Sequence, residues 1–194
     1  MDNQTSHADT IIRNHMMWSM GAGFIPVPIA DFFAVSAVQL DMIRQLCKVY
    51  NIDFQQTQGK AVITAMTGSS LARMGARVVK LIPGVGSVLG GVTLAVLSGA
   101  STYALGEVFK KHFETGGTFL DFDVERLKKF YNEKFEKGKQ VAEELRKNQE
   151  KTETSADQSG VISQLQQLAK LKEDGILTEE EFLELKKKII PSMV

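Results

Sequence analysis

The chain has little of what catalytic, metal-binding or nucleic-acid-binding proteins usually carry. Among its 194 residues Cys47 is the single cysteine, which excludes an internal disulfide and indicates a small buried thiol in a reducing compartment. His7, His15 and His112 are too far apart in sequence to suggest a metal site. The 23 basic residues balance 23 acidic ones, so no net field would attract nucleic acid. The composition therefore predicts no metal site, no cofactor and no nucleic-acid partner.

Nucleotide- and calcium-binding motifs are also incomplete. In the glycine-rich segment 84–90, the third glycine comes one residue too late for a dinucleotide fingerprint, and the Gly-Lys-Ser/Thr ending of a P-loop is missing. An EF-hand alignment at residues 170–181 would put Lys170 and Lys172 at oxygen-ligand positions, where ammonium groups would repel calcium. No set of side chains supports a nucleophilic or acid–base mechanism. We therefore predict no catalytic residue and expect that the protein is not an enzyme.

What the chain does have is a long neutral segment, residues 81–106, with no charged side chain. About 20 predominantly apolar residues can span a bilayer as a helix, so its length permits a crossing. A helix without a charged stripe must be enclosed by lipid, by other helices of the same chain, or by copies of itself. Small residues at four-residue spacing let helix backbones approach closely. They predict a helix-packing and oligomerisation surface at Gly86, Gly90, Gly91, Ala95 and Gly99.

Apolar periodicity predicts helices over residues 8–20, 28–50 and 54–80, and from the neutral segment to about residue 113. Prolines and glycines separate them, because proline disfavours helix at its own position and just before it. The predicted hairpin turns contain Pro26, Pro28, Pro83 and Gly84. We expect an all-α fold with two hydrophobic helical hairpins hinged at these residues, followed by a long amphipathic helix over residues 121–147.

Residues 148–160 contain almost nothing apolar and are expected to form a flexible linker. The remainder, 161–194, reads as a small helical hairpin in which Gly175 ends one helix and Thr178 with Glu181 forms a capping box for the next. The predicted domains are thus 1–147 and 161–194, joined by the linker. The expected contact surface of the terminal hairpin consists of Leu165, Leu168, Phe182, Leu185 and Ile189.

Two segments resemble known families. GFIPVPIADFFAVSAVQLDMIRQLCKVYNI and LIPGVGSVLGGVTLAVLSGASTYALGEVFKKHFETGGTFLDFD, with their Ile-Pro turns and Asp31, are similar to the YcjF-like bacterial domain of unknown function that is associated with GTPases. This resemblance covers about residues 8–145. The segment LAKLKEDGILTEEEFLELKKKII resembles the SHOCT short C-terminal domain, which implies oligomerisation. Together the resemblances imply membrane association and a GTPase partner in trans, since this chain has no GTPase motif.

Two functional hypotheses follow. In the first, the protein is a non-enzymatic, self-assembling helical protein at the cytoplasmic face of the cell membrane, in contact with lipid and serving as partner or anchor of a GTPase. The absence of a signal-peptide pattern in MDNQTSHADTII agrees with this location. In the second, it is a cytoplasmic homo-oligomeric scaffold or shell protein whose apolar helices form the core between subunits. Arg73, Arg77 and Lys80 favour the second hypothesis, because cations resist burial in hydrocarbon.

Overall fold

The apolar periodicity of the chain produces helices and no strand in the part that a computed structural model describes, which comprises residues 3–22, 28–78, 86–152 and 157–189. The prediction of an all-α fold is therefore confirmed. The helices are α1 (Asn3–Ala22), α2 (Pro28–Tyr50), α3 (Gln56–Val78), α4 (Gly86–Glu114), α5 (Val124–Thr152), α6 (Asp157–Glu173) and α7 (Glu179–Ile189).

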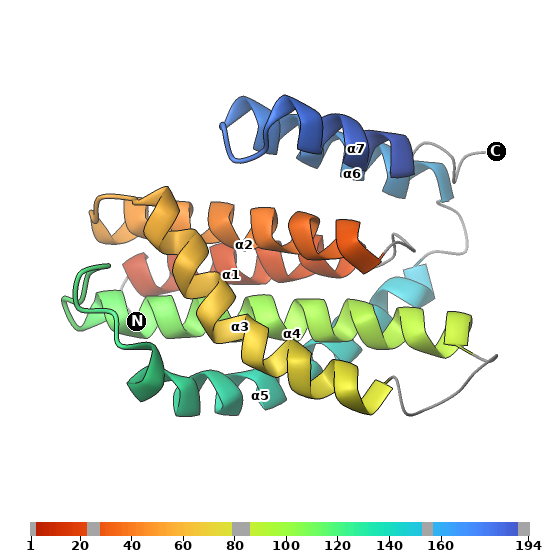
Figure 1. Ribbon diagram of the computed structural model, residues 1–194. Helices are drawn as coiled ribbons and strands as arrows, with labels where there is room; N and C mark the ends of the chain where they lie inside the picture. The colour runs from red at the N-terminus through yellow and green to blue at the C-terminus, as the bar shows by residue number, and fades with distance from the viewer. Residues whose placement is uncertain (1–2, 23–27, 79–85, 153–156, 190–194) are drawn as a thin grey trace.

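Helices α2, α1, α4 and α5 pack side by side in that order, and α4 has its most extensive contacts with α1 and α5 (Figure 1). Helix α3 runs obliquely across this bundle, and the α6–α7 hairpin lies beside α2. The second predicted hairpin thus differs from expectation. Among the described residues, α3 contacts α2 and α5 more than it contacts α4, so α3 and α4 do not pack as an antiparallel pair.

The neutral helix is enclosed by its own chain along its described C-terminal half. Ala104, Leu105, Val108 and Phe109 of α4 are fully buried, in one core with Ile12 and Met42 of the neighbouring helices. Burial on this scale supplies the main stabilisation of the bundle, at roughly 1.5–3 kcal/mol per large apolar side chain. No helix has a stretch that is both long and apolar enough to cross a membrane, within the residues open to description.

Several helices extend further than the sequence indicated. Helix α1 begins at Asn3, where Gln4 Nε2 donates to the backbone oxygen of Val49 over 2.7 Å and Asp9 pairs with Lys110. Tertiary contacts therefore stabilise the polar first turns of α1, which the apolar periodicity of the sequence does not predict. Helix α5 continues to Thr152 and α6 starts at Asp157, so both reach into the interval 148–160 that was expected to be a linker.

The caps of the terminal hairpin are confirmed. Gly175 has a φ of 69°, a backbone conformation that favours glycine, and the Ile176 amide donates to the Leu171 carbonyl over 2.9 Å. The Thr178 amide donates to Glu181 Oε2 over 2.8 Å, and the Glu181 amide donates to Thr178 Oγ1 over 3.2 Å. This reciprocal pair is the predicted capping box, and it sets the start of α7.

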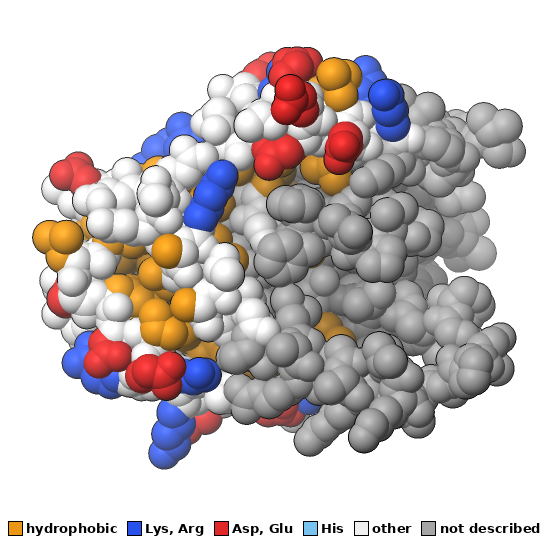
Figure 2. Space-filling view, in the orientation of Figure 1, with side chains coloured by type: hydrophobic (Ala, Val, Ile, Leu, Met, Phe, Trp, Pro, Cys, Tyr) orange, Lys and Arg blue, Asp and Glu red, His pale blue; other side chains and the backbone are white. Residues whose placement is uncertain are grey.

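The hairpin packs onto the bundle as well as onto itself. Leu168, Leu171 and Leu185 are buried and belong to the same apolar core as α1 and α2, while Leu165 and Phe182 are partly buried against it. The side chain of Ile189 lies outside the described residues. Figure 2 shows acidic side chains gathered over the hairpin, where Glu179, Glu180 and Glu181 begin α7.

Candidate functional site

A buried ion pair links the first two helices. His15 on α1 and Asp41 on α2 are 1% and 2% exposed, and His15 Nε2 lies 2.9 Å from Asp41 Oδ2. The other ring nitrogen, Nδ1, lies 2.8 Å from the carbonyl oxygen of Ile11. A carbonyl oxygen and a carboxylate both accept hydrogen bonds, so a ring that carries a proton on each nitrogen satisfies both partners. His15 and Asp41 therefore form a buried hydrogen-bonded pair between α1 and α2, which is an ion pair when the ring is protonated.

The surroundings of Asp41 favour its charged form. Burial by itself raises the pKa of this carboxyl. The hydrogen bond and positive charge of His15, the hydrogen bond from Gln45 and the charge of Lys170 together lower it further than burial raises it. Gln45 Nε2 donates to the same oxygen, Oδ2, over 2.8 Å. The net pKa of Asp41 therefore lies below its ordinary value. Trp18 covers His15, with ring centroids 4.8 Å apart.

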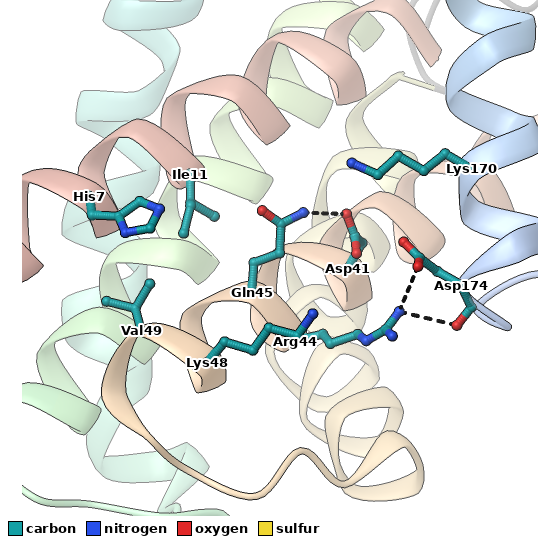
Figure 3. A pocket seen from close by; sticks show the side chains of 9 residues that line it. All are labelled: His7, Ile11, Asp41, Arg44, Gln45, Lys48, Val49, Lys170 and Asp174. Atoms are coloured by element: carbon teal, nitrogen blue, oxygen red, sulfur yellow. Dashed lines mark hydrogen bonds and ion pairs between the residues drawn. The ribbon is translucent and has the colours of Figure 1, made fainter.

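A pocket of about 460 Å³ opens beside this pair, where α6 meets α1 and α2 (Figure 3). Asp41 forms part of its wall, together with Asp174 and the three cations Arg44, Lys48 and Lys170. Arg44 Nη1 donates to the backbone oxygen of Asp174 over 3.1 Å and lies 3.5 Å from its carboxylate oxygen Oδ1. The remaining wall residues are His7, Ile11, Gln45 and Val49. The pocket thus joins the terminal hairpin to the bundle through charged side chains.

A second polar cluster lies between α2, α4 and α5. Gln39 Nε2 donates to the hydroxyl oxygens of Ser101 and Thr102, over 3.2 Å in each case, and the Ser101 and Tyr131 hydroxyls lie 3.0 Å apart. Burial raises the pKa of Tyr131 to about 12, although its hydrogen bond to Ser101 acts in the opposite direction. Because each group has a partner, this cluster specifies how the three helices pack.

Sequence reasoning missed both clusters. In sequence His15 is one of three widely separated histidines, and Asp41 lies 26 residues away from it. The available signal was the position of Gln39 and Asp41 beside core residues such as Leu40 and Met42. Such a position indicates a buried polar group that needs a partner, but it does not say which one.

Two of the predicted packing residues are enclosed within the single chain. Ala95 is fully buried, and a Cβ added at Gly99 would lie 2.6 Å from Met20 Cγ of α1 and 3.5 Å from Ala142 Cβ of α5. These small residues let α4 approach both neighbours closely. The backbones at Gly86, Gly90 and Gly91 belong to α4, but their surroundings lie outside the described residues.

The predicted turns lie mostly outside the described part of the chain. This holds for Pro26, Pro83 and Gly84, while Pro28 is the first residue of α2. Proline is favoured there because the first turn of a helix leaves its amides unpaired. The side chain of Asp31 is not among those described.

The remaining candidate ligands are dispersed or buried. Cys47 is 1% exposed, as predicted, and burial raises the pKa of its thiol to about 12. His112 is 3% exposed, and its Nε2 donates to the Thr118 carbonyl over 2.9 Å. No group of three or more histidine, cysteine, aspartate or glutamate side chains could hold a metal ion, among the residues described.

Comparison with known proteins agrees with this organisation. The model of a domain of unknown function, DUF697, matches residues 1–140, and that of the short C-terminal domain SHOCT matches residues 163–190. The chain is 36% identical over 148 residues to magnetosome membrane protein 22 of Magnetospirillum gryphiswaldense, covering 74% of this chain and 76% of that protein. No solved structure matches the chain significantly. The chain therefore belongs to the DUF697 family and carries a SHOCT domain after it.

Proposed function

We propose that this chain is a non-enzymatic, membrane-associated helical protein that assembles with copies of itself. The observation that carries the proposal is its relationship, over about three quarters of both chains, to a protein named for the magnetosome membrane. The non-enzymatic role is supported by what the buried polar groups do. His15 with Asp41, and Gln39 with Ser101, are occupied in joining one helix to another.

Membrane contact through one end of the bundle fits the geometry best. The ends of α1 and α3 and the beginnings of α2 and α4 lie at the same end of the molecule (Figure 1). In sequence, residues 28–35 carry one charge, on Asp31, and residues 86–94 carry none. By contrast, residues 104–109 of α4 are already buried by their own chain. The apolar beginnings of α2 and α4, rather than the flank of α4, are the surface that we assign to lipid. Arg73 and Arg77, near the end of α3, would then have to lie at the level of the lipid headgroups.

Flotation of the purified full-length chain with lipid vesicles tests this assignment. Phe33→Glu introduces a charge near the start of α2 and should abolish flotation, because a charge in hydrocarbon costs roughly 2.5–3.5 kcal/mol. Leu120→Glu is the matched control, since Leu120 is 84% exposed in the loop that follows α4, at the opposite end of that helix. Equal flotation of Phe33→Glu and the parent chain would contradict contact through this end.

Self-assembly is supported by apolar side chains that the single chain leaves open on the hairpin. Ile162 is 53% exposed and Leu183 is 43% exposed. Light scattering after gel filtration should show an oligomer that is lost in the double variant Ile162→Ser/Leu183→Ser. An oligomer that forms normally but ignores vesicles would favour a soluble homo-oligomeric scaffold instead.

We also propose a GTPase in trans as a partner, on the strength of the family resemblance. The test is the GTP hydrolysis rate of a candidate GTPase from the same organism, measured with and without this protein. The Leu120→Glu variant is the control in this assay, because its substitution lies in an exposed loop and should leave both the fold and the effect on the GTP hydrolysis rate unchanged. An unchanged rate together with no complex on gel filtration would rule out that candidate.

A further inference from the structure

The pocket between the bundle and the α6–α7 hairpin has more positive charge than its own acids neutralise. Asp174 is paired with Arg44, and Asp41, which lines the pocket, is paired with His15 and is also attracted by the charge of Lys170. Lys48 and Lys170 have no ion pair within the described part of the chain. Lys170 Nζ lies 5.9 Å from the centre of the Trp18 ring, a contact that leaves the ammonium hydrogens available. Lys48 thus faces the pocket without an ion pair in the described part of the chain, and Lys170 faces it with the longer-range attraction of Asp41.

These cations come from two separate parts of the molecule. Arg44 and Lys48 are four residues apart on α2, a spacing that puts both on the same face of the helix. Lys170 extends over the pocket from α6, on the other side (Figure 3). Arg44 presents five N–H donors and uses one nitrogen for Asp174, so it too has donors to spare. An anion in the pocket would contact the bundle and the hairpin at once.

The chemistry of the wall selects the class of anion. A phosphate group offers several acceptor oxygens in a tetrahedral arrangement, which suits ammonium and guanidinium donors that approach from two sides. The volume of about 460 Å³ lies within the usual range of small-molecule sites and leaves room for more than one phosphate group. We propose that this pocket binds a phosphate-bearing anion between Lys48 and Lys170, and that the bound anion holds the hairpin on the bundle.

The source of the phosphate is a soluble compound. Lys48 lies about 30 Å along α2 from Pro28, at about 1.5 Å per residue. The start of α2 is the end that we assign to lipid, so the pocket lies too far from that bilayer for its headgroups to reach. This last step rests on the proposed function, whereas the charge and geometry of the pocket do not.

Calorimetry with pyrophosphate at constant ionic strength tests the site in the full chain. The unmodified protein should bind saturably with one site. Lys48→Gln and Lys170→Gln should each raise the dissociation constant about tenfold or more, since each removes a charge-assisted contact. Lys129→Gln is the matched control, because Lys129 is an exposed lysine on α5, outside the pocket. Thermal unfolding of all variants establishes that they are folded, as expected for exposed side chains.

Hydrogen exchange of the α6 amides supplies the second readout. Pyrophosphate should slow this exchange in the unmodified chain and should not do so in Lys170→Gln. The site would be overturned if both lysine variants bound pyrophosphate as tightly as the parent chain does. It would also be overturned if the heat of pyrophosphate addition did not saturate and changed only with ionic strength. Lysine-dependent binding to vesicles that contain phosphorylated lipid, with none to pyrophosphate, would overturn the soluble source. Flotation in the absence of any phosphate compound tests the membrane role separately.

Discussion

His15 Nε2 on α1 lies 2.9 Å from Asp41 Oδ2 on α2, and neither side chain is more than 2% exposed. The pair joins two helices that also pack through apolar side chains such as Ile12 and Met42, and Gln45 donates a hydrogen bond to the same carboxylate. Both ring nitrogens of His15 have a hydrogen-bond partner, because Nδ1 lies against the carbonyl oxygen of Ile11. A buried pair of this kind gives little net stability over an apolar pair, but the loss of one partner leaves the other charge unpaired.

We therefore expect Asp41→Ala to lower the free energy of unfolding by about 3–5 kcal/mol. The double variant His15→Leu/Asp41→Leu should recover most of that loss, because it removes both charges from the core. Urea denaturation of the two variants and the parent chain measures the difference. Glu133→Ala, at an exposed position on α5, is the control and should change little. A double variant as unstable as Asp41→Ala would contradict this account.

The lowered pKa of Asp41 predicts a loss of stability in acid. Since the pKa is lower in the folded than in the unfolded chain, the ionised carboxylate stabilises the fold above the ordinary value of 3.8. This contribution is lost as the pH falls through the folded-state pKa. Asp41→Asn should therefore be less stable than the parent chain at pH 7, and the gap should narrow as the pH falls below 3.8. Urea titrations across this range provide the measurement, and a gap independent of pH would refute the assignment.

Two glycine-to-alanine substitutions within helices should change the free energy of unfolding in opposite directions. At Gly106 a Cβ would lie 2.7 Å from Ile12 Cγ1 and 3.0 Å from Met42 Sδ, whereas nothing lies within 4 Å at Gly68. Overpacking should make Gly106→Ala less stable by about 1–3 kcal/mol. Gly68→Ala should be more stable by roughly 0.5–1 kcal/mol, because alanine has the higher helix propensity. Chemical denaturation of both proteins decides the matter, and stabilisation at Gly106 would show that α1 yields easily.

The thiol of Cys47 should be inert in the folded protein. Burial raises its pKa to about 12, so the reactive thiolate is scarce at neutral pH and reagents have no access. A thiol-specific chromogenic reagent should label the chain slowly in buffer and rapidly in denaturant. The ratio of these two rates is the measurement. Rapid labelling in buffer would mean that α2 opens locally.

Docking of the hairpin should depend on apolar contact more than on its ion pair. Ile176 and Leu177 are 6% and 5% exposed, whereas the Arg44 and Asp174 side chains are 27% and 33% exposed. Leu177→Ala should therefore weaken docking by about 2–5 kcal/mol and Arg44→Ala by at most about 1 kcal/mol. Hydrogen exchange should report faster exchange in α6 for Leu177→Ala, with α1 and α2 unchanged. A larger effect of Arg44→Ala would reverse this ranking.

Local features were predictable because they depend on neighbours in sequence. Apolar periodicity identified the helices, and Thr178 with Glu181 marked the start of α7. The amphipathic helix predicted over residues 121–147 corresponds to α5, in which Tyr131 and Phe135 are buried. The start of α1 and the lengths of α5 and α6 were not predicted, because these polar turns carry no apolar periodicity from which to infer them.

The sequence by itself determined that the chain is helical, where most helices end, and that its neutral segment must be enclosed. The tertiary structure decided what encloses the described part of that segment, namely α1, α2 and α5 of the same chain. It also decided that His15 meets Asp41 and that Lys170 faces Lys48 across a pocket. The reason is physical. Helix formation and capping depend on residues a few positions apart, whereas burial and charge pairing depend on side chains that only packing brings together.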